Sequence, residues 1–111
     1  MRIEQQRVGS VDVLMPVGAL VDEDGEQFGD TLLTRLRTSN PRVVLVMQEV
    51  PYMDSAALEM LLEASDLLVE RAASLKLAAV TSTCREILEL SGLSERFQFF
   101  NAMEDGVRSY L

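Results

Sequence analysis

The chain has 111 residues, 48% of them hydrophobic, which is enough to bury one core and too short for two ordinary domains. Eighteen acidic residues against ten basic ones give a formal net charge of −8, and no Lys/Arg cluster occurs, so nucleic acid is not expected as a partner. The absence of His excludes imidazole general bases, the Ser-His-Asp relay and His-based metal sites.

The chain is expected to be cytoplasmic and not to insert into a membrane. Its longest unbroken apolar run, Val43 to Met47, is far shorter than the roughly 20 residues that a membrane-spanning helix needs. The first residues, MRIEQQR, lack the apolar middle of a secretory signal. The single Cys84 cannot form an internal disulfide, which agrees with a reducing compartment, and it is expected to be a small buried thiol.

The first elements are predicted to be a hairpin and a helix. Ile3 to Val8 and Val11 to Pro16 flank Gly9-Ser10, as two antiparallel strands joined by a tight turn require. Farther on, Asp24 with Gln27 three residues later resembles a capping pair at the start of a helix. The buried face of this helix is marked by apolar residues at spacing four, namely Phe28, Leu32 and Leu36.

The middle of the chain predicts a strand, a long helix and a second strand. Val43 to Met47 is apolar throughout, which favours an interior strand. The helix after Asp54 is expected to run to about Ala73, and Leu75 to Val80 should form the next strand, parallel to the first. The predicted buried stripe of this helix is Leu58, Leu61, Leu62, Ser65, Leu68, Val69 and Ala72.

Two more helices and a last strand complete the predicted order. Thr83 with Glu86 resembles a capping box, and Gly92 should stop the helix that follows. Phe97 to Phe100 predicts a short strand, and Asn101 opens a terminal helix. The residues expected to face inward are Ile87, Leu88 and Leu90 in the first helix, and Val107, Tyr110 and Leu111 in the second. The predicted fold is α/β, with a mixed sheet of four or five strands and helices packed mainly on one side.

The most informative feature is Asp54-Ser55, where an apolar strand passes through a short turn into a helix start. Unpaired backbone N–H groups and the helix dipole at such a place stabilise a phosphate group. Two interpretations remain open from the residues alone. Ser55 is a phosphorylated switch, or it merely caps the helix.

The order of elements and four local motifs resemble the STAS domain, the fold shared by anti-sigma factor antagonists and the cytoplasmic ends of sulfate transporters. The motifs are Gly18-Ala19-Leu20, Asn40 to Val46, Asp54-Ser55 and the run SGLSERFQFF from Ser91 to Phe100. The resemblance spans nearly the whole chain and implies one STAS-like domain over residues 1–111.

The resemblance also implies a function. In phosphorylatable members, the serine after the aspartate accepts phosphate from a partner kinase, and the matching residue is Ser55. Such a protein, when unmodified, binds an anti-sigma factor of the serine protein kinase type and releases the sigma factor; a serine phosphatase reverses the modification. The chain would then be a substrate and a ligand, not an enzyme, with no cofactor. The alternative is a STAS subunit of a transport or signalling scaffold complex that is never phosphorylated.

The sequence departs from the family pattern at three places. Ala56-Ala57 stands where members often carry a small residue and then Gly, and Met47-Gln48 replaces the usual acid at the end of the third strand. An acid often follows the Gly-x-Leu motif directly in family members, whereas here Val21 follows it and the acid, Asp22, comes one position later.

The predicted partner-binding surface extends from Ser55 along one face of its helix. It consists of Asp22, Asp54, Ser55, Ala56, Met60 and Glu63. The other interpretation of Met60 is that it only widens the buried face of the helix, together with Leu67.

The sequence gives little support to a metal site or to an enzyme. The acidic run Asp22, Glu23, Asp24, Glu26 and Asp30 lacks the register of a calcium loop, so a solvated cluster is expected. A small enzyme or nucleotide binder on a similar scaffold is the remaining rival, but the chain has no Gly-rich phosphate loop such as GxxxxGK[ST].

Overall fold

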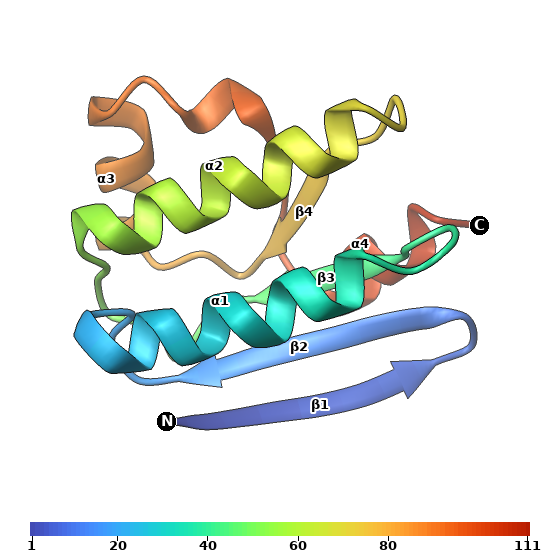
Figure 1. Cartoon of the computed structure of the whole chain (residues 1–111), viewed down its shortest axis with the longest axis horizontal. Coiled ribbons are helices and arrows are strands. Elements are labelled where there is room, and N and C mark those ends of the chain that lie inside the picture. Colours follow the sequence, from blue (N-terminus) through green and yellow to red (C-terminus); the bar gives the residue numbers. More distant parts are fainter.

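The computed structural model describes residues 1–111 and contains a five-stranded mixed sheet between helices (Figure 1). The strands lie in the order β1-β2-β3-β4-β5, with β1 antiparallel to β2 and the other neighbours parallel. Their bounds are Arg2–Val8, Val11–Val17, Val43–Val46, Leu75–Ala78 and Phe97–Phe100. The predicted mixed sheet and its parallel β3-β4 pair are confirmed.

Most of the helical structure covers one face of the sheet. Helices α1 and α2 lie side by side across that face (Figure 1), whereas α4 packs on β3, β4 and β5 from the opposite face. The helices are α1 (Asp22–Leu36), α2 (Ser55–Val69), α3 (Ser82–Leu90) and α4 (Met103–Arg108), with a short 3₁₀ turn at Ser94–Arg96. None of them is both long and apolar enough to cross a bilayer.

Strand β3 lies at the centre of the sheet and is buried on both faces. Leu45 points into the larger core, which it shares with Phe28, Leu61 and Leu77. Val44 belongs to a smaller cluster on the other face, beneath α4. Successive side chains of a strand point to opposite faces, so a strand covered on both sides is apolar throughout, as the run predicted.

The predicted helix caps are wrong at three helix starts, although the helices themselves are present. Helix α1 starts at Asp22, two residues before the predicted Asp24–Gln27 pair, and α4 starts at Met103 without a side-chain cap from Asn101. Helix α3 is capped by Thr81 and not by Thr83. The Thr81 hydroxyl accepts the N–H of Cys84 at 3.3 Å and donates to the carbonyl of Val50 at 2.9 Å, so a tertiary contact selects the capping residue.

The structure buries fewer of the apolar residues on the predicted inward faces of the helices than the sequence predicts. Val69, Leu90 and Leu111 were expected to face inward, but their exposed fractions are 59%, 81% and 96%. Helix α2 ends at Val69, short of Ala73, because Ala72 adopts a left-handed backbone conformation with φ +55°. All three exposed residues lie at helix or chain ends, where the helix no longer follows the surface of the core.

Candidate functional site

A backbone bridge outside the main strands brings the starts of α1 and α2 together. Leu20 and Met53 form an isolated parallel bridge. The N–H of Leu20 donates to the carbonyl of Tyr52 at 3.1 Å, and the N–H of Asp54 donates to the carbonyl of Leu20 at 3.1 Å. The segment that enters α1 therefore runs directly beside the segment that enters α2, although Asp22 and Asp54 are 32 positions apart along the chain.

The Asp54 carboxylate caps both helices at once. One oxygen, Oδ1, accepts the N–H of Ala57 in the first turn of α2 at 2.9 Å, and the other, Oδ2, accepts the N–H of Asp22 at the start of α1 at 3.0 Å. These bonds, the one from Asp22 first and the one from Ala57 next, hold the pKa of Asp54 below its ordinary value. The negative charge lies where the dipoles of two helices favour it.

Ser55 is the first residue of α2 and is exposed. The N-cap of this helix is Asp54, so the capping role that the sequence left open for Ser55 belongs to its neighbour. The Ser55 side chain is therefore accessible to another macromolecule at the amino-terminal end of a 15-residue helix. Whether it is phosphorylated remains a prediction.

A groove of about 380 Å³ runs between α1 and α2 next to Ser55, and is called the Ser55 groove below. The predicted partner-binding residues Asp22, Asp54, Ala56, Met60 and Glu63 all line it. Ser55 is beside the groove and does not line it. The opposite wall comes from α1 and was missed by the sequence analysis; it consists of Gly25, Glu26, Gly29, Asp30 and Leu33. Their spacing of three or four residues places them on one helix face, which is the signal that could have indicated them.

The two helices approach closely where Gly29 faces Met60. A Cβ atom added at Gly29 would lie 2.7 Å from Met60 Cγ, so no larger residue fits without a shift of the Met60 side chain. Met60 is half-buried and also packs against the core. It therefore widens the buried face and also lines the groove, and its role in partner binding stays a prediction. Leu67 is half-buried as well and lies outside the groove.

The STAS-domain family model matches residues 2–106. The chain belongs to the STAS-domain family. A search of the curated proteins found no match to this sequence.

Solved structures with the same fold include whole small proteins and one part of a much larger transporter. A Thermotoga maritima protein, TM1081, assigned as an anti-sigma factor antagonist, superposes with a TM-score of 0.87 at 18% identity, covering 96% of this chain and 92% of that one. The Bacillus cell fate determinant SpoIIAA in its phosphorylated form gives 0.75 at 18%, covering 99% and 100%. The murine anion transporter Slc26a9 gives 0.76 at 16%, covering 93% of this chain and 18% of the transporter. At these identities the similarity establishes the fold.

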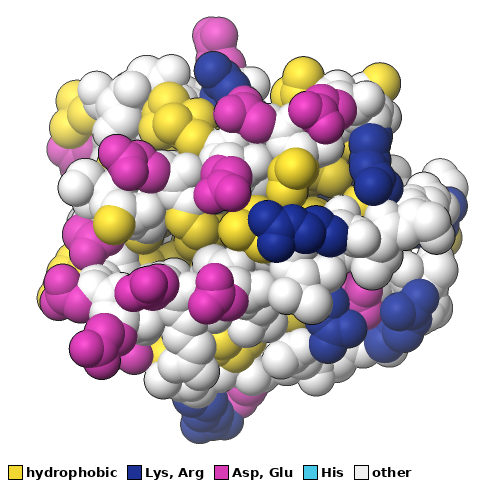
Figure 2. Space-filling model, viewed as in Figure 1, with side chains coloured by type: hydrophobic (Ala, Val, Ile, Leu, Met, Phe, Trp, Pro, Cys, Tyr) yellow, Lys and Arg dark blue, Asp and Glu magenta, His cyan; other side chains and the backbone are white.

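The Ser55 end of this STAS domain is strongly acidic. Figure 2 shows acidic side chains gathered over the amino-terminal halves of α1 and α2, at the left of the view. The groove lining contains Asp22, Glu26, Asp30, Asp54 and Glu63, and no Lys or Arg. A phosphate group on Ser55 would therefore meet further negative charge and no cation from the groove.

The other titratable groups that the sequence pointed out do not form a site. The acidic residues at the start of α1 are exposed to solvent, and no group of three or more His, Cys, Asp and Glu side chains is arranged to hold a metal ion. Cys84 is buried, as predicted, and its thiol donates to the carbonyl of Val50 at 3.3 Å. Burial raises the pKa of this thiol, which disfavours the reactive thiolate.

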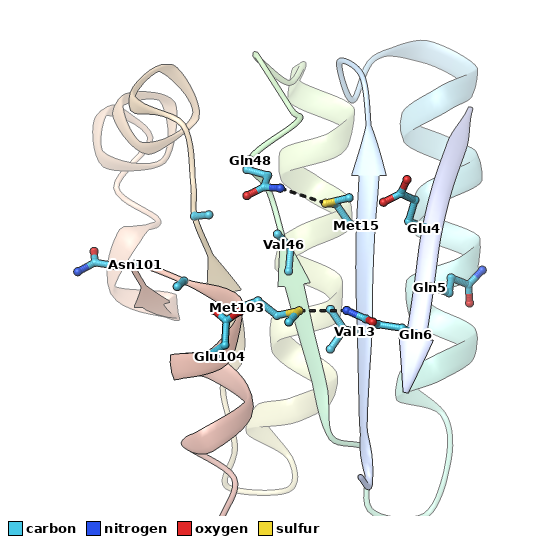
Figure 3. A pocket seen from close by; sticks show the side chains of 12 residues that line it. Glu4, Gln5, Gln6, Val13, Met15, Val46, Gln48, Asn101, Met103 and Glu104 are labelled. Atoms are coloured by element: carbon cyan, nitrogen blue, oxygen red, sulfur yellow. Dashed lines mark hydrogen bonds between the residues drawn. The ribbon is translucent and has the colours of Figure 1, made fainter. Parts of the chain in front are cut away.

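A larger hollow of about 520 Å³ lies on the opposite face of the sheet, between β1 and α4 (Figure 3). It contains none of the predicted site residues. Several of its polar side chains already have partners in the chain, since the Gln6 amide donates to the Met103 sulfur and the Gln48 amide to the Met15 sulfur. Glu4 in its wall is paired with Arg2. This hollow therefore offers few free polar groups for recognition of a ligand.

Proposed function

We propose that this STAS domain is a phosphorylation-regulated anti-sigma factor antagonist. Unmodified Ser55 and the Ser55 groove bind an anti-sigma factor of the serine protein kinase type, which then releases its sigma factor. The kinase supplies ATP and catalysis, and a serine phosphatase removes the phosphoryl group. The domain itself is substrate and ligand in this scheme, with a role in transcription regulation.

The observation that carries the proposal is the position of Ser55. Its side chain is exposed at the start of α2, beside a groove that collects every other residue predicted to bind a partner. A kinase can therefore reach the hydroxyl without unfolding the helix, because Asp54 already caps it. The similarity of the fold to SpoIIAA, a protein solved in a phosphorylated form, supports the same assignment.

Phosphorylation would act on the complex more than on the fold. A phosphoryl group adds about −1.5 to −2 charges; its contact with the α2 dipole is worth roughly 0.3 to 1 kcal/mol in the monomer, and repulsion from the exposed acidic side chains nearby opposes this gain. Within an interface, an unpaired desolvated charge costs several kcal/mol, and the groove offers no cation to pair with it. The cost of the unpaired charge in the interface is larger than the change in stability of the monomer. Modification should therefore weaken binding and leave the monomer folded.

Incubation of the purified chain with a kinase-type anti-sigma factor and ATP tests the modification. Intact-mass analysis should show addition of a single phosphoryl group to the parent chain and none to Ser55→Ala. The matched control is Ser82→Ala, because Ser82 is also an exposed first residue of a helix, α3. Loss of modification in the Ser82 variant and not in the Ser55 variant would refute the assignment.

Binding to the same anti-sigma factor tests the switch. Ser55→Asp should raise Kd by more than about tenfold, whereas Ser55→Ala should bind like the parent chain, since only the former adds charge to the interface. Isothermal titration calorimetry measures both affinities. Equal affinities for all three chains would contradict the switch.

The alternative function is that of an unmodified STAS subunit in a transport or scaffold complex. The similarity of the fold to part of the anion transporter Slc26a9 supports it. Phosphate-affinity electrophoresis of the protein from its native cell separates the two functions, because only the switch predicts a phosphorylated fraction that shifts with conditions.

A further inference from the structure

The basic side chains that lack an acidic partner are concentrated at one end of the molecule. Of the ten Lys and Arg residues, five form ion pairs with Asp or Glu. The other five are Arg35, Arg37, Arg42, Arg71 and Lys76, which are called the basic end below. They lie where α1 and α2 end and where β3 and β4 begin, opposite the Ser55 groove, and Lys and Arg side chains dominate this side of Figure 2.

Four of these five cations are held in place by neutral groups. The guanidinium groups of Arg35, Arg42 and Arg71 donate to the Gln5 side chain, the Ser10 hydroxyl and the Thr38 carbonyl, at 2.6, 3.0 and 2.7 Å. A chain with 18 acidic residues could have neutralised these positions, but none of its carboxylates forms an ion pair there. No ion pair within the chain therefore neutralises these five cations.

Lys76 is the most confined of these cations. Its ammonium donates to the Ser109 hydroxyl at 2.6 Å and lies 3.9 Å from the centroid of the Tyr110 ring. Burial lowers the pKa of Lys76, and no carboxylate is present to offset it. Burial removes part of the hydration that stabilises the charged ammonium, and a bound anion would replace it with an ionic interaction.

A hollow of about 460 Å³ opens beside Lys76. Ser74 and Gln98 supply further polar groups, and Pro41, Leu68 and Tyr110 supply apolar surface. This combination fits a short carbon stem that ends in a negative charge, such as the side chain of Asp or Glu.

The helix ends at this surface disfavour any anion, and a doubly charged phosphate more than a singly charged carboxylate. Helices α1 and α2 point their carboxy-terminal ends here, with partial negative charge and no free N–H groups, whereas phosphate sites usually use helix amino termini. Five separate cations from different segments match single charges spaced along a polypeptide. The net charge of −8 opposes every anionic partner at long range, and an extended anionic membrane more than a short acidic segment that reaches only the basic end.

We propose that the basic end is a second interaction surface, which binds an acidic segment of a partner polypeptide and places one Asp or Glu side chain against Lys76. The 15 residues of α1 span about 22 Å, so Ser55, beside the start of α1, lies roughly one helix length from the basic end, although the groove itself extends along α1 to Leu33. Charges at Ser55 and at the basic end are therefore more than two Debye lengths apart at physiological ionic strength, so a charge bound at one is largely screened from the other. The domain can then join two partners, and the proposal stands whether or not Ser55 is modified.

Nuclear magnetic resonance titration of the ¹⁵N-labelled chain with a hexaglutamate peptide at low ionic strength locates the surface directly. Amide shifts should concentrate at residues 42, 74–76, 98 and 109–110. Hexalysine serves as the probe of opposite charge and should shift the amide resonances of residues that line the acidic Ser55 groove. Hexaglutamate shifts spread over the whole surface, or absent at the basic end, would overturn the proposal.

Variants then test the role of Lys76. Lys76→Gln should weaken hexaglutamate binding about tenfold. Arg71→Gln should weaken it only severalfold, because Arg71 is exposed and solvent would screen its ion pair with the peptide. Arg2→Gln removes the same charge at an ion-paired, distant position and should leave Kd unchanged. Equal affinities for the Lys76 and Arg2 variants, both folded by circular dichroism, would refute the site. Binding of phosphatidylserine vesicles in place of the peptide would also refute it.

Discussion

Asp54 shows how one side chain can organise a functional surface. Its two carboxylate oxygens accept N–H groups from Asp22 and Ala57, and thereby fix the starts of α1 and α2 relative to each other. Asp22 has φ +49°, a left-handed conformation that this bond helps to hold. The geometry of the Ser55 groove thus depends on an acid whose role is structural, beside a serine whose proposed role is regulatory.

Asp54→Asn should lower the melting temperature, because the amide has one acceptor oxygen and its NH₂ group would face one of the two N–H donors. Thermal unfolding followed by circular dichroism measures the change. Asp30→Asn is the control, since it removes the same charge from the groove without removing a cap. A melting temperature equal to that of the control would show that the double cap contributes little.

The Asp54 carboxyl group should also contribute to the loss of stability at acidic pH. Its pKa in the folded chain is below the ordinary value, so the stabilisation is complete above the pKa of the unfolded chain and is lost as the pH falls through the folded pKa. Urea unfolding between neutral and strongly acidic pH should show a shallower decline for Asp54→Asn than for the parent. Parallel declines would assign the acid sensitivity to other groups.

At the scale of elements, helix ends depend on a few backbone conformations. Helix α3 ends at Leu90, and Gly92 follows with φ +72° and open space around the position of a Cβ atom. The predicted stop at Gly92 is confirmed. Only the backbone conformation, and not crowding, restricts the residue at this place.

Gly92→Val should destabilise the fold by about 1 to 2 kcal/mol, because a β-branched residue is strained in the left-handed region. Gly92→Asn should cost less, since Asn tolerates that region better. Chemical denaturation gives both free energies of unfolding. The prediction fails if the Val and Asn variants are equally stable, because strain at positive φ would then not be the cause.

At the scale of the whole molecule, the last helix covers β3, β4 and β5 on the face of the sheet that α1 and α2 leave open. The Tyr110 hydroxyl, just beyond α4, donates to the carbonyl of Val43 at 2.8 Å and accepts the N–H of the same residue at 3.1 Å. These bonds join the end of the chain to the start of β3, 67 residues earlier. The centre of the sheet is therefore buried on both faces only when the carboxy-terminal segment docks.

Tyr110→Phe should lower the free energy of unfolding by about 1 to 2 kcal/mol, because the substitution removes both bonds and leaves the Val43 N–H without its partner. Tyr52→Phe removes a hydroxyl from a side chain that is 51% exposed and should change stability little. Urea denaturation compares the two. Equal effects would mean that the Tyr110 bonds do not hold α4 against the sheet.

The sequence by itself determined the elements, their order and the family. Hydrophobic periodicity, Gly9 and Gly92 are local signals, because a strand, a turn or a helix stop depends on residues within a few positions of one another. The Asp54-Ser55 motif likewise placed Ser55 at a helix start, where the structure has it.

Only the tertiary structure decided what lies beside these elements. The pairing of Leu20 with Met53 gave Asp54 its second helix, and the contact of Thr81 with Val50 selected the cap of α3. The α1 wall of the Ser55 groove and the unpaired cations of the basic end come from segments far apart in the chain. Such groups meet because sheet order and parallel crossovers bring them together, and no local pattern of residues encodes that arrangement.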